Sequence, residues 1–238
     1  MDRITRKELK TDKFAEEVGH TVEFLEKHRR QALLLGGAAL VLIVAVAGVF
    51  YYMKHQRSVR QEALHESLRV YDATISPESN PFFVTFKTEE EKAAAVQKAL
   101  GEIASKYSGS DEAAIASFYL GLAANNRGRS DEAEKQLKQA MDSGRKPYDS
   151  QAAYSLAQLY SGQGRNEDAE KILRKLVEEP SVLVSKEQAT IALARVVGKR
   201  DPAEARKLLE PLRGARSAVS RSALTALGEL PQPPPEQP

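Results

Sequence analysis

The feature that most constrains the fold is an internal repeat of 36 residues in the second half of the chain. The segment YLGLAANNRGRSDEAEKQLKQA at 119–140 aligns with SLAQLYSGQGRNEDAEKILRKL at 155–176. A further step along the chain reaches Ala205, Leu209 and Leu212. Periods of 20–50 residues are typical of stacked units, each of which buries its apolar face against the next.

Each unit is predicted to be a pair of antiparallel helices. Gly128 and Gly164 are suited to end the first helix, because glycine adopts the left-handed conformation of a helix end. The second helix is expected to begin with an N-cap, which is followed in the third unit by a proline at the first helical position. The expected N-caps are Ser130, Asn166 and Asp201. The expected core positions are alanines 133, 169 and 205, where the helices cross, and leucines 137, 173 and 209 one turn later.

This pattern resembles the tetratricopeptide repeat, in which a Leu-Gly pair lies in the first helix and an alanine near the start of the second. Leu120-Gly121, Tyr160 and the three alanines match that pattern. The departures are the 36-residue period, where the family has 34, the alanine at 157, and a degenerate third unit. The helix expected at 89–107 would be the second half of an incomplete unit, and 217–230 a capping helix.

An uncharged, mostly apolar run precedes the repeats. It extends over 21 residues, 32–52, and a helix of that length spans about 30 Å, the thickness of the hydrocarbon core of a bilayer. Tyr51 and Tyr52 lie where an aromatic belt is expected. The sequence therefore predicts an all-α protein with one transmembrane helix followed by a tetratricopeptide-like helical-hairpin solenoid.

Two points about this segment stay open at this stage. Ala45-Val46-Ala47 fits a signal-peptide cleavage site, but the preceding tail is long and acidic for an export signal, which favours a permanent anchor. Lys and Arg are balanced near the two ends of the run. The basic residues crowded at its N-terminal edge and the length of the C-terminal part favour a cytoplasmic N-terminus.

The predicted organisation has five parts. They are a charged tail at 1–30, the transmembrane helix at 31–53, a linker helix and loop at 54–88, the repeat domain at 89–230 and a Pro-rich tail at 231–238. In the first part, a stripe of Phe14, Val18, Val22 and Leu25 predicts a helix. It would either dock on a partner or the membrane surface, or simply extend the transmembrane helix.

Composition argues against several classes of function. The net charge is +2 with both signs interspersed, so no nucleic-acid surface is indicated, and the absence of cysteine excludes disulfides and thiolate sites. The four histidines have no metal-ligand spacing, and no phosphate-binding or catalytic motif is present. We therefore expect no enzyme activity, no cofactor and no metal.

Function is then expected at the protein surface. Repeat arrays of this type present a concave face lined by their first helices, and the resemblance implies which side chains would line it. The expected peptide-binding residues are Phe118, Leu122, Asn125, Asn126, Tyr154, Gln158 and Ser161. Apolar and amide side chains suit an extended or helical peptide. The family's carboxylate-clamp variant is not expected, since it needs lysine and asparagine where Phe118 and Leu122 stand.

The layout also resembles the YfgM-like family of single-pass bacterial inner-membrane proteins, which are associated with the Sec translocon and with periplasmic chaperones. That resemblance implies a membrane-anchored scaffold or chaperone-like adaptor with its C-terminal domain in the periplasm. Its partners would be translocon subunits, periplasmic chaperones or exported clients. The alternatives are an assembly factor for envelope complexes or outer-membrane proteins, and a structural membrane protein whose repeats mediate self-association.

Overall fold

The computed structural model describes residues 29–78, 83–215 and 217–231. The predicted tail helix with Phe14 and Val18 lies outside this part, as does almost all of the Pro-rich tail. The chain divides into two units, Met1–Ser58 and Val59–Pro238. In the described part it is predominantly helical, as expected.

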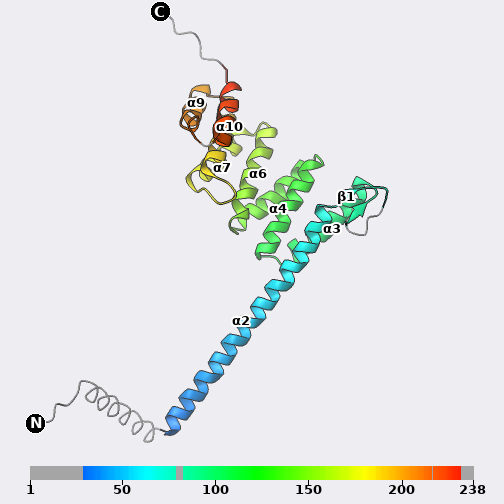
Figure 1. The fold of residues 1–238 in the computed structure, drawn as a ribbon, viewed down its shortest axis with the longest axis vertical. Helices are drawn as coiled ribbons and strands as arrows, with labels where there is room; N and C mark the ends of the chain where they lie inside the picture. The colour runs from blue at the N-terminus through cyan, green and yellow to red at the C-terminus, as the bar shows by residue number, and fades with distance from the viewer. Residues whose placement is uncertain (1–28, 79–82, 216, 232–238) are drawn as a thin grey trace, which may run out of the picture. The chain divides into compact units, whose positions relative to one another are not determined.

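One helix, α2, runs without a break from Arg29 to Tyr71 (Figure 1). It contains the apolar run and continues through the segment that we predicted as a separate linker helix. Its part from Leu33 onward is the one helix among the described residues that is long and apolar enough to cross a membrane. In its most apolar window, none of the residues is buried by the rest of the chain.

Between α2 and the next helix, the described residues contain a feature that an all-α prediction missed. β1 (Thr74–Ile75) and β2 (Thr85–Phe86) form a two-stranded parallel ladder. Each strand of this ladder has only two residues. Backbone groups of the two strands hydrogen-bond to one another, as in the 3.0 Å bond from the Ser76 amide to the Phe86 carbonyl.

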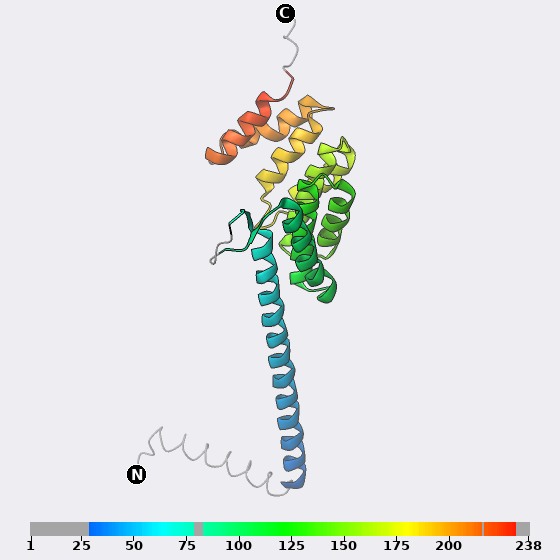
Figure 2. The ribbon, with the colours of Figure 1, turned by 90° about the vertical axis from the view of Figure 1, so that its right-hand side faces the viewer.

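The remaining helices follow one another in antiparallel pairs, which Figure 2 shows from a second direction. α4 packs on α5, α6 on α7 and α8 on α9, and each pair contacts the next. Their bounds are α3 Glu89–Lys106, α4 Asp111–Asn126, α5 Ser130–Asp142, α6 Tyr148–Gly162, α7 Asn166–Glu178, α8 Lys186–Val197, α9 Pro202–Leu209 with a 3-10 turn Glu210–Leu212, and α10 Ser217–Gly228.

The turns inside the hairpins follow the predicted chemistry in part. Gly128 and Gly164 have φ of 70° and 77°, the left-handed region in which a side chain would be strained. The predicted N-cap at Asp201 is confirmed, because its carboxylate accepts from the backbone amides of the first turn. Ser130 and Asn166 are the first helical residues rather than N-caps. Arginines occupy the two N-cap positions and use their side chains elsewhere, as described below.

The periodic alanines and leucines form the core, as the repeat predicted. Each alanine of the period is fully buried, and each leucine is at most 1% exposed. The residues are Ala133, Ala169, Ala205, Leu137, Leu173 and Leu209. Because each lies between its own hairpin and a neighbour, burial of this apolar area stabilises the whole stack rather than a single unit.

The incomplete unit that we expected at α3 has a first helix after all. The last three turns of α2 pack on α3, where Leu64 contacts a cluster that contains Val96 and Leu100. The Ser67 hydroxyl donates to the Ala63 carbonyl of its own helix at 2.9 Å and also lies 3.4 Å from the Ala99 carbonyl of α3. The end of a helix that the sequence assigned to the membrane and linker therefore completes the first hairpin.

We predict that Leu173→Ala will destabilise the protein by about 2–5 kcal/mol, because the residue is buried and its removal leaves a cavity between α7 and its neighbours. The measurement is urea unfolding of the soluble part followed by circular dichroism. Leu224→Ala on α10 is the matched control, since this leucine is 50% exposed and should change the midpoint little. Equal shifts for the two variants would contradict the register of the repeat.

A second pair of variants tests how closely the helices approach. A methyl group on Gly121 would lie 2.7 Å from Cγ of Leu137, so Gly121→Ala should cost about 1–3 kcal/mol. Gly101 is also in a helix interior but has no atom within 4 Å of the added methyl group. Gly101→Ala should therefore stabilise by about 0.5–1 kcal/mol through helix propensity. The same unfolding assay measures both, and stabilisation by both would contradict the close approach.

Candidate functional site

The seven residues predicted to line a peptide-binding groove all lie on α4 and α6, but they differ in exposure. Phe118 is 5% exposed, and its ring packs 5.3 Å from Tyr119 and 6.4 Å from Tyr148, centroid to centroid. Its side chain therefore belongs to the core, and its assignment to the accessible groove was wrong. The reason is that α4 is enclosed by α5 and α6, so that this face of the helix is covered.

The other predicted residues are at least partly accessible. Leu122 and Tyr154 pack against the same core cluster as Phe118 and remain partly exposed, while Asn125 and Gln158 are exposed. The Ser161 hydroxyl accepts a hydrogen bond from Lys199 at 3.4 Å. Asn126 is also exposed and lines a cavity described below. An apolar pair flanked by amides is thus available on two neighbouring first helices.

Charged and aromatic residues connect the second hairpin (α4 and α5) to the third (α6 and α7) at the ends of their helices. We call the contact between two neighbouring hairpins a junction. The carboxylate of Glu134 on α5 accepts from Arg165 at 2.6 Å and from Lys138 at 2.7 Å. The hydroxyl of Tyr160 donates to the same carboxylate at 3.0 Å. The guanidinium of Arg165 lies over the Tyr160 ring, 3.9 Å from its centroid. A ring and a carboxylate thus fill the space between these hairpins.

This cluster changes the acidity of its central carboxyl group. The hydrogen bond from Lys138, with further ones from Arg165 and Tyr160, lowers the pKa of Glu134 to about 2. Burial opposes the change but is outweighed. Because the charged form is favoured in the folded protein, the cluster stabilises the stack when Glu134 is ionised.

The next junction lies between the third hairpin and the fourth (α8 and α9). It has an acidic residue at the position of Glu134 but no aromatic ring at the position of Tyr160. Glu170, 36 residues after Glu134, pairs with Arg200 at 3.1 Å and with Arg174 at 2.7 Å. Arg174 also reaches Glu204 on α9 at 2.6 Å. Val196 stands where Tyr160 stands in the preceding unit, and a cavity of about 470 Å³ lies beside it.

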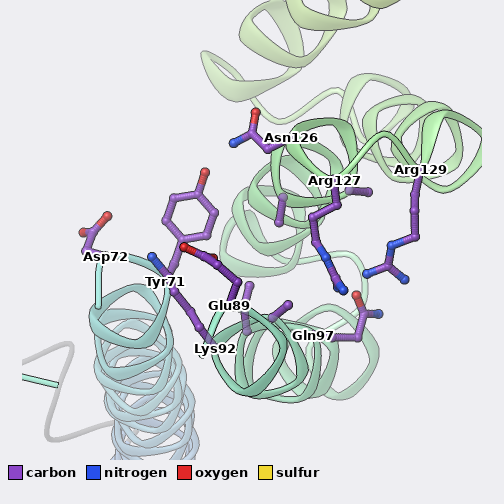
Figure 3. A pocket seen from close by; sticks show the side chains of 12 residues that line it. Tyr71, Asp72, Glu89, Lys92, Gln97, Asn126, Arg127 and Arg129 are labelled. Carbon is purple, nitrogen blue, oxygen red and sulfur yellow. The ribbon is translucent and has the colours of Figure 1, made fainter. Parts of the chain in front are cut away.

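The first junction, between α3 and α4, has neither the acid nor the ring. A cavity of about 390 Å³ opens between the end of α2, the start of α3 and the end of α4. Figure 3 shows the side chains of Gln97, Arg127 and Arg129 converging on one side of it. Tyr71, Asp72, Glu89 and Lys92 lie on the other side. These junctions were not predicted from the sequence, although the acidic residues at the repeat period, Glu134 and Glu170, were a signal of them.

Nothing in the described part of the chain suggests a reaction. No group of three or more His, Asp or Glu side chains there is placed to hold a metal ion. Glu134 is the one ionisable group among the described residues with a strongly lowered pKa, and its ion pairs between helices account for the change without a catalytic role. The arrangement offers surfaces and a cavity for binding.

Comparison with known proteins adds the following. A family model described as "Tetratricopeptide repeat-like domain" matches residues 29–180. Two crystal structures of a putative kinesin light chain with nearly identical TPR-like repeats, from Podosopora anserina, are similar to 58% of this chain and 77% of theirs. Their sequence identity is 18%, with TM-scores of 0.49 and 0.48. No curated protein matches the chain.

We predict that Glu134→Gln will make stability less dependent on acid. The folded-state pKa of about 2 lies below the usual value of 4.5, so the stabilisation is complete above about pH 5 and is lost as pH falls toward 2. At pH 7 the variant should be less stable by about 1–2 kcal/mol, discounted for the partial exposure of the cluster. The two proteins should converge near pH 2.

The measurement is the urea midpoint of the soluble part at several pH values. Glu102→Gln is the control, since Glu102 is exposed on α3 and no ion pair is recorded for it in the described part of the chain. It should follow the wild type at every pH. A constant difference between Glu134→Gln and wild type from pH 7 to pH 2 would contradict the assignment.

Proposed function

Because the chain belongs to the tetratricopeptide repeat-like family, we propose that it is a membrane-anchored scaffold that binds polypeptide segments of other proteins. Stacked helical hairpins of this family are general platforms for protein–protein contact. The finer proposal is a chaperone-like adaptor in the bacterial inner membrane, close to the Sec translocon, whose clients are exported chains. The resemblance of the whole layout to the YfgM-like family supports it.

The single observation that carries the anchor is the uncovered apolar surface of α2. Its large apolar side chains are 60–74% exposed from Leu33 to Met53, and none of the most apolar window is buried by the protein. A soluble monomer rarely exposes a continuous apolar surface of this length. A lipid bilayer covers it, and a helix satisfies its own backbone hydrogen bonds there.

The proposed orientation places the N-terminal tail in the cytoplasm and the repeat domain in the periplasm. Basic residues lie at the N-terminal edge of the apolar run, including Arg29 and Arg30, and long domains are translocated largely regardless of their own charge. The repeat domain then meets polypeptides as they leave the membrane.

The proposed binding surface is the accessible part of the predicted groove. Leu122 and Tyr154 supply apolar contact, and the exposed amides of Asn125 and Gln158 can hydrogen-bond to a peptide backbone. This combination recognises a backbone and a few apolar side chains rather than one sequence. Such tolerance is suited to an adaptor with several clients.

The experiment is photo-crosslinking of the full-length protein in its native membrane, followed by mass spectrometry. Photoreactive residues replace Asn125 and Gln158, with Lys171, exposed on the second helix α7, as the matched control. We expect the protein to remain in membranes washed with alkaline carbonate. We also expect the two groove positions to capture exported chains or translocon subunits that the control position does not.

Other outcomes distinguish the alternatives. Crosslinks to cytoplasmic proteins would reverse the orientation. Products that contain only this chain would favour self-association, and capture of envelope-assembly machinery would favour the assembly-factor alternative. Release of the protein by carbonate would contradict the anchor.

A further inference from the structure

The cavity at the first junction differs from its neighbours in a way that indicates a ligand. Its apolar lining includes Val96, Ala123 and Ala124. Gln97, Arg127 and Arg129 converge on one side of it (Figure 3). With a volume of about 390 Å³ it is of the size of known ligand sites. It lies at the ends of the helices and includes only Asn126 of the predicted groove residues.

The repeat shows what occupies the same place one unit later. Ala124 and Tyr160 are 36 residues apart, so the tyrosine ring of the second junction is replaced by a methyl group in the first. The buried residues Val96 and Leu100 of α3 correspond to Ala133 and Leu137 of α5, which lie 37 positions later in the chain. The next residue along each helix is Gln97 in α3 and Glu134 in α5.

The arginine of the junction is retained, although its ring and acid are missing. Arg129 occupies the same place before α5 as Arg165 does before α7. Arg165 pairs both with Asp168 in its own turn at 2.8 Å and with Glu134 on the neighbouring hairpin. Arg129 keeps the first contact, with Glu132 at 2.9 Å. In the described part of the chain, no second carboxylate is recorded for it.

The charges around the cavity favour an anion on one side. Arg127 lines that side, and it takes part in none of the ion pairs between the residues that the structure describes. The acids that also line the cavity, Asp72 and Glu89, lie on the opposite side from the two arginines (Figure 3). At the third junction, by contrast, Glu170 neutralises Arg200 directly.

We propose that this cavity binds a polypeptide segment of another protein through an aromatic side chain next to an acidic one. The aromatic ring takes the space that Tyr160 fills in the second junction, against Ala124 and beside Arg129. The carboxylate takes the place of Glu134 and pairs with Arg129 and Arg127. A guanidinium can hold both groups at once, as Arg165 does in this chain.

This inference rests on the proposed function, since it assigns one contact of a protein-binding scaffold. The peptide site in the cavity and the proposed function can be tested separately. Crosslinks from Asn125 and Gln158 test the groove without reference to the cavity, whereas the peptide assay below tests the cavity in purified protein.

The assay uses the full-length protein in detergent micelles and fluorescence anisotropy of a labelled peptide, Gly-Ser-Glu-Tyr-Asp-Ser-Gly, blocked at its C-terminus by an amide. We expect saturable binding to the wild type. Replacing the tyrosine by alanine, or both acids by their amides, should weaken binding at least tenfold. A second peptide that ends in tyrosine with a free carboxylate tests whether the carboxylate comes from a chain terminus instead of an acidic side chain. Binding of that peptide alone would overturn the proposal.

The sharpest variant fills the cavity with the residues of the second junction. Gln97→Glu combined with Ala124→Tyr should abolish peptide binding and leave thermal stability equal or higher, because the chain already accommodates this pair one unit later. Arg127→Ala combined with Arg129→Ala removes the charges instead and should weaken binding at least tenfold. Arg213→Ala is the control, since its side chain is 55% exposed and pairs locally with Glu210. Unchanged affinity in both double variants would overturn the proposal.

Discussion

The close crossing of two helices within each hairpin is the constraint on which the rest of the structure depends. Fully buried alanines at 133, 169 and 205 bring the helices together, and the leucine one turn later fills the space beside them. In the hairpin of α4 and α5 the fit is tight enough that Gly121 faces the Leu137 side chain without room for a methyl group. A larger residue at these positions would separate the helices and expose the leucines.

Apolar contacts hold the helices together both within and between hairpins, since one buried cluster contains residues of α4, α5, α6, α7 and α8. At the ends of the helices, an acid on one hairpin also pairs with an arginine in the turn of the next hairpin, as in Glu134 with Arg165 and Glu170 with Arg200. The apolar contacts provide most of the stability and the ion pairs add a smaller amount, since they are partly exposed. The junctions can therefore vary without loss of the fold, which leaves room for a binding site.

The continuity of α2 links the two features that matter most for function. One helix carries the apolar surface proposed to lie in the membrane and also the residues around Leu64 that pack on α3. From the sequence we divided this segment at residue 53, because the apolar run ends there and charged residues follow. Nothing local marks the later residues as the first helix of the solenoid. That role follows from their packing on Val96 and Leu100.

The sequence by itself determined the repeat, its period, the two left-handed glycines and the core alanines and leucines, because these depend on local conformation and on an apolar pattern that recurs at a fixed spacing. It did not determine which side chains of the first helices stay accessible, so Phe118 was assigned to a groove while it lies in the core. The cavity at the first junction could not be predicted from the sequence either. It results from residues far apart in the chain, Tyr71, Gln97 and Arg129, and from the small residue at 124, and only the stacking of the hairpins brings these together.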